Sequence, residues 1–202
     1  MKQQIIQGTE DLVFQYGIKS ITMDDIAKHF GISKKTIYTF FVDKNEIVHA
    51  LMQKKIREHE KEFKAIEKQS SNVIEEFFLI MEHVGDMFRK INPKTFYDLQ
   101  KYHAKTWMLF TKFKEEFVFR MIESTLKRGI KQGLIRPKIN IEILVRMRMQ
   151  QIDMGMNPSV FPSEKFALVD VHLSILEHFL YGICTLKGHA LINKYNQLSE
   201  EL

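Results

Sequence analysis

The chain has 202 residues, of which 45% are hydrophobic and 27% are charged, an ordinary balance for a globular protein with its own core. Its formal net charge of +5 is compatible with a nucleic-acid partner but does not demonstrate one, since residues 1–55 hold eight lysines against six acidic residues and basicity is only local, at Lys28, Lys34, Lys35 and Lys44. No apolar run is long enough for a membrane span, the N-terminus lacks a signal-peptide pattern, and Cys184 is the single cysteine, so we expect a cytoplasmic protein without a membrane partner.

The first fifty residues carry start and stop signals for several short helices. A first apolar helical pattern stops at Gly17. Thr22, with Asp25 three residues later, forms the capping-box pattern that starts a second helix. Gly31 can supply the left-handed conformation that often ends a helix, and Ser33 can cap a third helix. The sequence therefore predicts two helices joined by a tight turn.

The segment 22–41 has the pattern of a helix-turn-helix motif. The second of its helices has an inward side formed by Ile37 and Phe41, which lie four residues apart. Its outer side carries residues that can donate hydrogen bonds to an anion, namely Lys34, Lys35, Thr36 and Tyr38. Two short helices with one shared core and one cationic outer face predict that the second helix enters a DNA major groove.

A second capping-box pattern, Asp43 with Glu46, starts a fourth helix directly after this motif. Three helices and the start of a fourth within about fifty residues closely resemble the DNA-binding domain of TetR-family repressors. The resemblance is carried by Gly17, Ile21, Thr22, Ile26, Ala27, Phe30, Gly31, Ile32, Ser33, Thr36, Ile37, Tyr38, Phe41, Asp43, Lys44 and Glu46. It implies an all-α protein in which a three-helix DNA-binding domain, residues 1–52, precedes a helical domain, residues 53–202, for effector binding and dimerisation.

The residues expected to contact DNA are Thr22, Ser33, Lys34, Lys35, Thr36, Tyr38 and Lys44. The first two start helices, where backbone N–H groups and the helix dipole attract phosphate. The two lysines of the third helix can reach guanine edges, although phosphate contact or plain solvation fits them equally well. The last three match family positions that contact the DNA backbone. Thr39 and Phe40 depart from the residues usual in the family, so the resemblance does not imply an operator sequence.

The rest of the chain reads as helical, with no convincing alternating strand pattern. A narrow apolar stripe predicts a connecting helix over 44–69, and a fifth helix follows until Asn92. An aromatic-rich pair of helices leads to a turn near residues 131–137. Asn140 can start the next helix, and Ser163 is expected to cap the last long one.

The resemblance also implies a ligand cavity after the connecting helix and a homodimer. The aromatic and methionine side chains between Met81 and Phe119 must be mostly core, but they would line an apolar cavity for a mainly hydrophobic effector. The expected ligand-binding residues are Tyr97, Tyr102, His103, Trp107 and Phe110. The dimer would form through the helices that start at Asn140 and Ser163, with Met147, Leu173, Leu176, Leu180 and Ile183 as its apolar surface. The alternative is that this surface closes on the core of its own chain.

Recognisable catalytic patterns are absent from the sequence. It has no pair of histidines four residues apart, no paired cysteines, no phosphate-binding glycine loop and no serine nucleophile elbow. We therefore expect neither an enzyme nor a metal or other cofactor. The leading hypothesis is a TetR-like dimeric repressor that a small ligand releases from operator DNA. A helical enzyme or carrier with an aromatic pocket, and a partner-binding protein whose N-terminal motif is only structural, are the alternatives; salt-sensitive, sequence-dependent DNA binding separates them.

Overall fold

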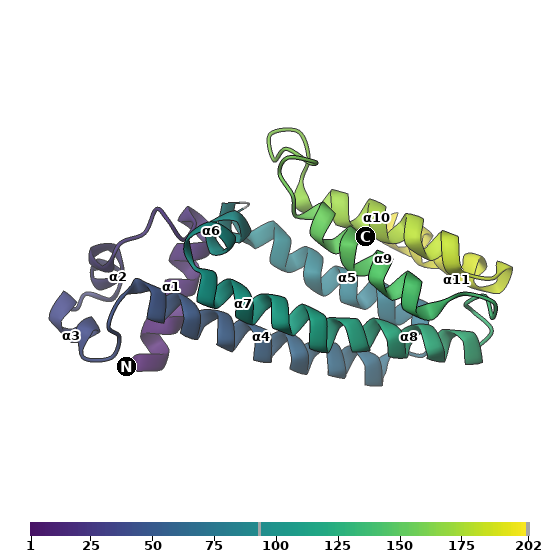
Figure 1. The fold of residues 1–202 in the computed structure, drawn as a ribbon, viewed down its shortest axis with the longest axis horizontal. Coiled ribbons are helices and arrows are strands. Elements are labelled where there is room, and N and C mark those ends of the chain that lie inside the picture. Colours follow the sequence, from purple (N-terminus) through teal and green to yellow (C-terminus); the bar gives the residue numbers. More distant parts are fainter. Residues whose placement is uncertain (93, 201–202) are drawn as a thin grey trace. The chain divides into compact units, whose positions relative to one another are not determined.

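The structure, a computed structural model, describes residues 1–92 and 94–200, and its regular elements are helices, as expected (Figure 1). Their bounds are α1 Lys2–Tyr16, α2 Met23–Phe30, α3 Lys34–Tyr38, α4 Lys44–Gln69, α5 Val73–Lys90, α6 Lys94–Tyr102, α7 Ala104–Phe113, a π-helical turn Lys114–Val118, α8 Phe119–Lys131, α9 Ile141–Gly155, α10 Leu168–Ile183 and α11 Leu186–Glu200. Within the described ranges, no helix is both long and apolar enough to cross a membrane.

Two compact units divide the chain. Unit 1 contains residues 1–60 and 87–113, and unit 2 contains residues 61–86 and the chain from 114 onward. Helices α4 and α5 thus contribute to both units, while α6 and α7 belong with the N-terminal helices. The functional division after residue 52 remains a prediction, because it follows the extent of the DNA-binding motif and not the compactness of the fold.

The helix signals of unit 1 work as the sequence predicts. Helix α1 ends at Gly17, whose φ of 79° is unfavourable for other residues. At the start of α2, the Thr22 hydroxyl accepts a hydrogen bond from the Asp25 N–H, and the Asp25 carboxylate accepts one from the Thr22 N–H, which completes the capping box. Gly31 ends α2 in the left-handed conformation, with φ 62° and ψ 30°. Ser33 then caps α3 by accepting a hydrogen bond from the Thr36 N–H.

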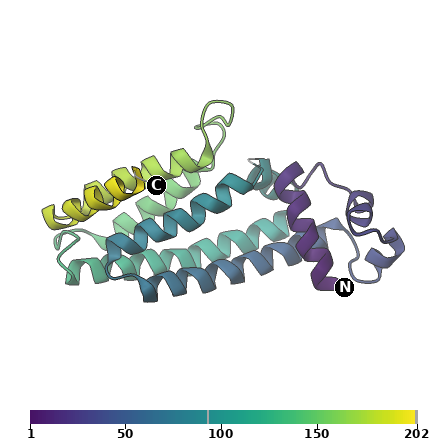
Figure 2. The ribbon, with the colours of Figure 1, turned by 180° about the vertical axis from the view of Figure 1, so that it is seen from behind.

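One apolar core holds unit 1 together. Helices α1 and α2 pack on each other, as do α2 and α3, and Figures 1 and 2 show α1 crossing the N-terminal part of α4. The fully buried side chains of this core include Ile5, Ile26, Ile37 and Ile47. Leu99 of α6 is buried in the same core. Helix α6 therefore helps to position the elements that carry the motif.

The core of unit 2 lies among α5, α8, α9, α10 and α11. Helix α9 packs between α8 and α10, and Asn140 caps it as predicted, accepting a hydrogen bond from the Ile143 N–H. The expectation that Ser163 caps the last long helix is wrong, because α10 begins at Leu168. The Pro162 carbonyl accepts hydrogen bonds from the N–H groups of the third and fourth residues after it, and this single turn does not continue into the helix.

Candidate nucleic-acid interface

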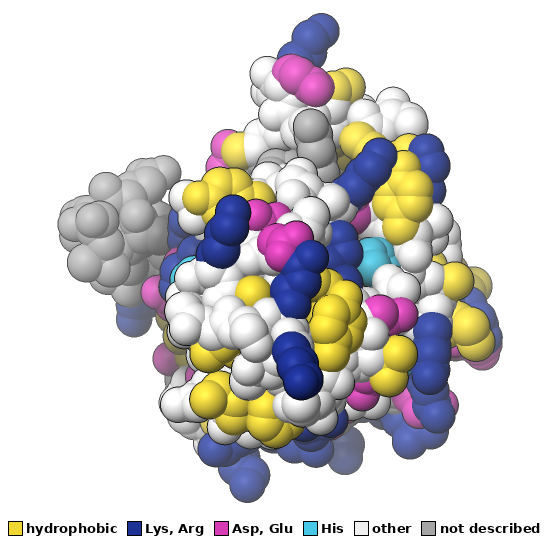
Figure 3. Space-filling view, turned by 90° about the vertical axis from the view of Figure 1, so that its left-hand side faces the viewer, with side chains coloured by type: hydrophobic (Ala, Val, Ile, Leu, Met, Phe, Trp, Pro, Cys, Tyr) yellow, Lys and Arg dark blue, Asp and Glu magenta, His cyan; other side chains and the backbone are white. Residues whose placement is uncertain are grey.

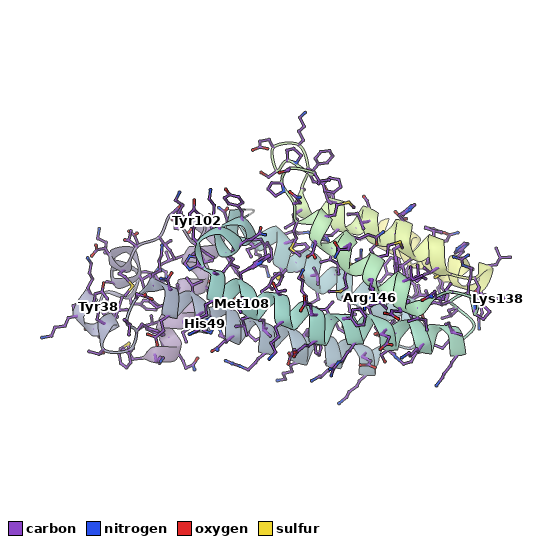
Figure 4. All side chains as sticks on the ribbon, viewed as in Figure 1. Tyr38, His49, Tyr102, Met108, Lys138 and Arg146 are labelled. Atoms are coloured by element: carbon purple, nitrogen blue, oxygen red, sulfur yellow. The ribbon has the colours of Figure 1, made fainter. Side chains whose placement is uncertain are left out.

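The turn between α2 and α3 fixes which side of α3 faces solvent. The Ile32 N–H donates to the Ala27 carbonyl oxygen at 3.1 Å, so the chain reverses directly after α2. Ile37 and Phe41 are buried, as predicted, and anchor α3 to the core. Tyr38 points the opposite way and is 52% exposed (Figure 4). Helix α3 ends at Tyr38, so Phe41 lies beyond the helix and not, as the sequence analysis expected, on it.

Two exposed lysines, Lys34 and Lys35, share the short helix α3 with this exposed tyrosine. Figure 3 looks onto the end of unit 1 that carries α2 and α3, and Lys and Arg side chains are spread over this face. The Lys34 ammonium lies 2.7 Å from an Asp24 carboxylate oxygen, and both side chains are largely exposed. An exposed ion pair contributes about 0–1 kcal/mol, so a DNA phosphate can displace it. Lys35 is exposed as well.

The hydroxyls at the two helix starts already have partners within the fold. Thr22 Oγ1 accepts from the Asp25 N–H at 3.2 Å and donates to Asp25 Oδ2 at 2.6 Å. The hydrogen bonds that the Asp25 carboxylate accepts from the Thr22 hydroxyl and from the Thr22 N–H lower its pKa, so it stays ionised. Ser33 Oγ accepts from the Thr36 N–H at 3.1 Å and is hydrogen-bonded to Thr36 Oγ1 at 2.9 Å. These side chains therefore hold the two helix starts in position.

Lys44 has a role within the fold that the sequence did not indicate. Its ammonium donates hydrogen bonds to the carbonyl oxygens of Ile18 at 3.0 Å and Ile21 at 2.7 Å, both in the loop before α2. Burial lowers the pKa of this lysine, and the nearby carboxylates of Asp98 and Asp25 partly offset that effect. An ammonium has three N–H donors, so Lys44 can secure the loop with two and offer the third to a phosphate.

The same loop is also held by α6, through a residue that the sequence analysis missed. Asp98 Oδ2 accepts a hydrogen bond from the Lys19 N–H at 3.0 Å, across 79 positions of sequence. The Lys19 ammonium lies 5.0 Å from the centre of the Tyr102 ring. No local pattern could have found this contact, because it depends on how α6 packs against the N-terminal helices.

The five residues expected to bind an effector all lie in unit 1. Trp107 and Phe110 of α7 pack against each other, with ring centres 5.4 Å apart, and His103 is buried. Tyr97 and Tyr102 of α6 are exposed, and each phenol oxygen accepts a hydrogen bond from a lysine. The two tyrosines thus belong to a cationic surface, whereas the other three are at least partly buried. Their role in ligand binding stays a prediction.

The residues expected to form a dimer surface divide into two groups. Met147 and Leu173 are 42% and 40% exposed and are available to a partner. Leu176, Leu180 and Ile183 are buried in the core of unit 2, so they do not form a surface. The alternative noted from the sequence applies to these three, because α10 turns them toward its own chain. In the described part of the chain, no three His, Cys, Asp or Glu side chains are placed to hold a metal ion.

Comparison with known proteins gives consistent matches. Residues 5–51 match the family described as bacterial regulatory proteins, tetR family. The HTH-type transcriptional regulator YvaF of Bacillus subtilis is 29% identical over 185 residues, which cover 91% of this chain and 95% of that protein. YhgD, another HTH-type transcriptional regulator of B. subtilis, is 30% identical over 67% of this chain and 72% of its own length. The crystal structure of the regulator FadR from B. subtilis in complex with stearoyl-CoA covers 91% of this chain and 100% of that chain, with a TM-score of 0.65 and 19% identity.

Proposed function

This chain belongs to the tetR family of bacterial regulatory proteins, which are transcriptional regulators and not enzymes, and we propose that it is a dimeric repressor released from operator DNA by a small, mainly hydrophobic ligand. In this proposal residues 1–52 bind DNA, and residues 53–202 bind the effector and a second copy of the chain. A cytoplasmic location follows from DNA as the partner.

The observation that carries the DNA-binding part is the outward face of α3. Buried Ile37 and Phe41 hold the short helix to the core, while Tyr38, Lys34 and Lys35 project into solvent from the same turns. A buried support beneath exposed cationic side chains suits insertion into a major groove. We propose phosphate contacts for Tyr38 and for the remaining donor of Lys44, and base or phosphate contacts for Lys35.

A gel-shift titration tests the DNA-binding part of the proposal. The protein is titrated against DNA that flanks its coding region, at several salt concentrations. The wild type should prefer that DNA over unrelated DNA, and its affinity should fall steeply with salt. Tyr38→Ala should weaken binding about five- to tenfold, the equivalent of one lost hydrogen bond. Tyr16→Ala is the matched control, because Tyr16 is 51% exposed but lies at the end of α1. Equal affinity for all sequences would contradict a regulator and favour a structural motif.

Dimerisation is proposed because one motif reads only a few base pairs, so specific binding needs two copies about one helical turn apart. Unit 2 offers an exposed apolar row on α9, formed by Ile143, Met147 and Met154, together with Leu173 on α10. Such residues, when they gather on two adjacent helices, indicate an interaction surface. Light scattering at micromolar concentration tests the proposal, and a monomeric wild type would contradict it.

The effector proposal draws on two observations. The core of unit 2 is apolar and contains adaptable methionines such as Met81 and Met149. The structurally similar FadR of B. subtilis was crystallised with stearoyl-CoA, which carries a long hydrocarbon chain. Neither observation bears on His103, Trp107 and Phe110, which lie in unit 1 and stay ligand contacts predicted from the sequence. A thermal-shift screen of hydrophobic compounds, followed by operator titration with each hit, should find one that lowers operator affinity about 5- to 150-fold. Hits that stabilise the protein without this effect would argue against a switch.

A further inference from the structure

Unit 2 holds several cationic side chains that are buried or partly buried, and Lys114 and Arg128 each have a carboxylate partner. Arg128 Nη2 lies 2.8 Å from each oxygen of the Glu76 carboxylate, which is fully buried. The buried ammonium of Lys114 donates to the Asp153 carboxylate. Burying a charge is costly unless an opposite charge and hydrogen bonds compensate it. Both of these cations follow that rule.

The buried charge of Arg148, on α9, is not compensated by an opposite charge in this way. Its side chain is more deeply buried than that of Arg128, with the residue only 5% exposed, and no described carboxylate forms an ion pair with it. Within the described residues, its Nη1 has no hydrogen-bond partner. Burial lowers the pKa of the guanidinium to about 10, so the group remains protonated near neutral pH. The interior of unit 2 therefore holds a positive charge that the fold itself does not neutralise.

Phe179 and His172 of α10 both lie close enough to Arg148 of α9 to interact with its guanidinium. The guanidinium carbon lies 5.7 Å from the centre of the Phe179 ring, at one point of the contact between α9 and α10. Seven residues away on each helix, Gly155 faces His172 so closely that a Cβ on the glycine would lie 2.7 Å from the imidazole. Burial and the charge of Arg148 lower the pKa of His172 to about 4, so this histidine is neutral. Gln151, one turn after Arg148, has a buried Oε1 without a partner in the described part of the chain.

A buried arginine with an unpartnered N–H group is suited to bind an anion. Arg148 is buried by residues of its own chain. Arg146, two residues earlier on α9 and labelled in Figure 4, is exposed and pairs with Glu142, so the helix separates a solvated arginine from an internal one. The Phe179 ring can support one face of the guanidinium while its N–H edge stays available for a planar oxyanion. Met149 and Leu176, which are buried nearby on the same two helices, suit a hydrocarbon chain.

We propose that Arg148 anchors the effector by binding an oxyanion, a carboxylate or a phosphate, at one end of an otherwise apolar molecule. The inference rests on the proposed function, because it names the chemical class of the ligand that controls DNA binding. The effector is then an anionic amphiphile, and a neutral hydrocarbon of the same length is a poor substitute for it.

Three probes with one hydrocarbon chain and different head groups test this inference: decanoate, decyl phosphate and decanol. Thermal shift and calorimetry on the full-length protein should show binding of at least one anion and at least about tenfold weaker binding of decanol. The two anions distinguish a carboxylate ligand from a phosphate ligand. Arg148→Gln should remove the preference for the anion by lowering its affinity at least about tenfold, while Arg146→Gln should behave as the wild type.

The ligand-free protein provides a second measurement. An arginine kept for a ligand destabilises the unliganded fold, so Arg148→Gln and Arg148→Met should keep or raise its melting temperature. A lower melting temperature in both variants would show that the guanidinium is satisfied within the fold, and would overturn the proposal. Decanol binding as tightly as the anions, or no binding of any carboxylate or phosphate from the hexyl to the hexadecyl chain at millimolar concentration, would overturn it too.

Operator titration without ligand separates this inference from the function on which it rests. Arg148→Gln should bind the flanking DNA as the wild type does, because unit 1 carries the DNA-binding face. If the wild type binds an anion through Arg148 but no specific DNA, the regulator proposal fails while the anion site stands. If it binds specific DNA but no anion, only the anion site fails.

Discussion

The replacement of Lys44 by methionine tests how much the DNA-binding face depends on one half-buried ammonium. Methionine keeps most of the side-chain volume and removes the hydrogen bonds to the carbonyl oxygens of Ile18 and Ile21, at 3.0 and 2.7 Å. A hydrogen bond to a charged group contributes about 1.5–3 kcal/mol, and relief of the partial burial of the charge returns some of this. We therefore expect the free energy of unfolding to fall by about 2 kcal/mol.

For a chain of this length, that loss corresponds to a melting temperature about 4–8 °C lower. Circular dichroism gives the shift, and hydrogen exchange should show faster opening at residues 17–22, where the loop loses its support. Lys35→Met is the matched control, because Lys35 is exposed and should stay within about 0.5 kcal/mol of the wild type. Operator affinity of the Lys44 variant should fall, and its salt slope should drop by about one if the third N–H meets a phosphate. Stability equal to that of the control would refute the role of Lys44 in holding the loop before α2.

Three further outcomes are expected. His172 has a pKa of about 4 in the fold against 6.5 in the unfolded chain, so the unfolded chain binds more protons between these two pH values. The free energy of unfolding therefore falls as the pH drops from 6.5 to 4, by up to about 3 kcal/mol. Urea midpoints of His172→Gln should show a flatter pH dependence, and an unchanged slope would reject this explanation. Leu180→Glu should unfold unit 2 because Leu180 is buried, whereas Leu173→Glu should leave the fold intact and yield monomers by light scattering. Asp98→Ala should weaken operator binding several-fold without changing the salt slope, because Asp98 positions the loop at Lys19 and contacts no phosphate; a changed slope would contradict that role.

Local sequence signals were sufficient to predict the architecture of the DNA-binding motif. The caps at Thr22 and Ser33, and the left-handed turn at Gly31, are set by residues within a few positions of one another, and the structure has each of them. The burial of Ile37 and Phe41 could also be predicted, although α3 ends before Phe41. Such signals are reliable because a capping hydrogen bond or a positive φ depends on the local chain and hardly on what packs against it.

Which partner each side chain contacts could not be predicted, because it depends on how the helices pack. Periodicity shows that α10 has an apolar face, but not that Leu180 is covered by its own chain while Leu173 remains exposed. In the same way, the sequence marks Lys44 as a contact to the DNA backbone but not as a donor to the loop before α2, and nothing near Asp98 indicates a partner 79 positions earlier. The physical reason is common to these cases. A side chain's burial and hydrogen bonds are set by segments that are distant in sequence, and the helical pattern records only which side of a helix is apolar, not what covers it.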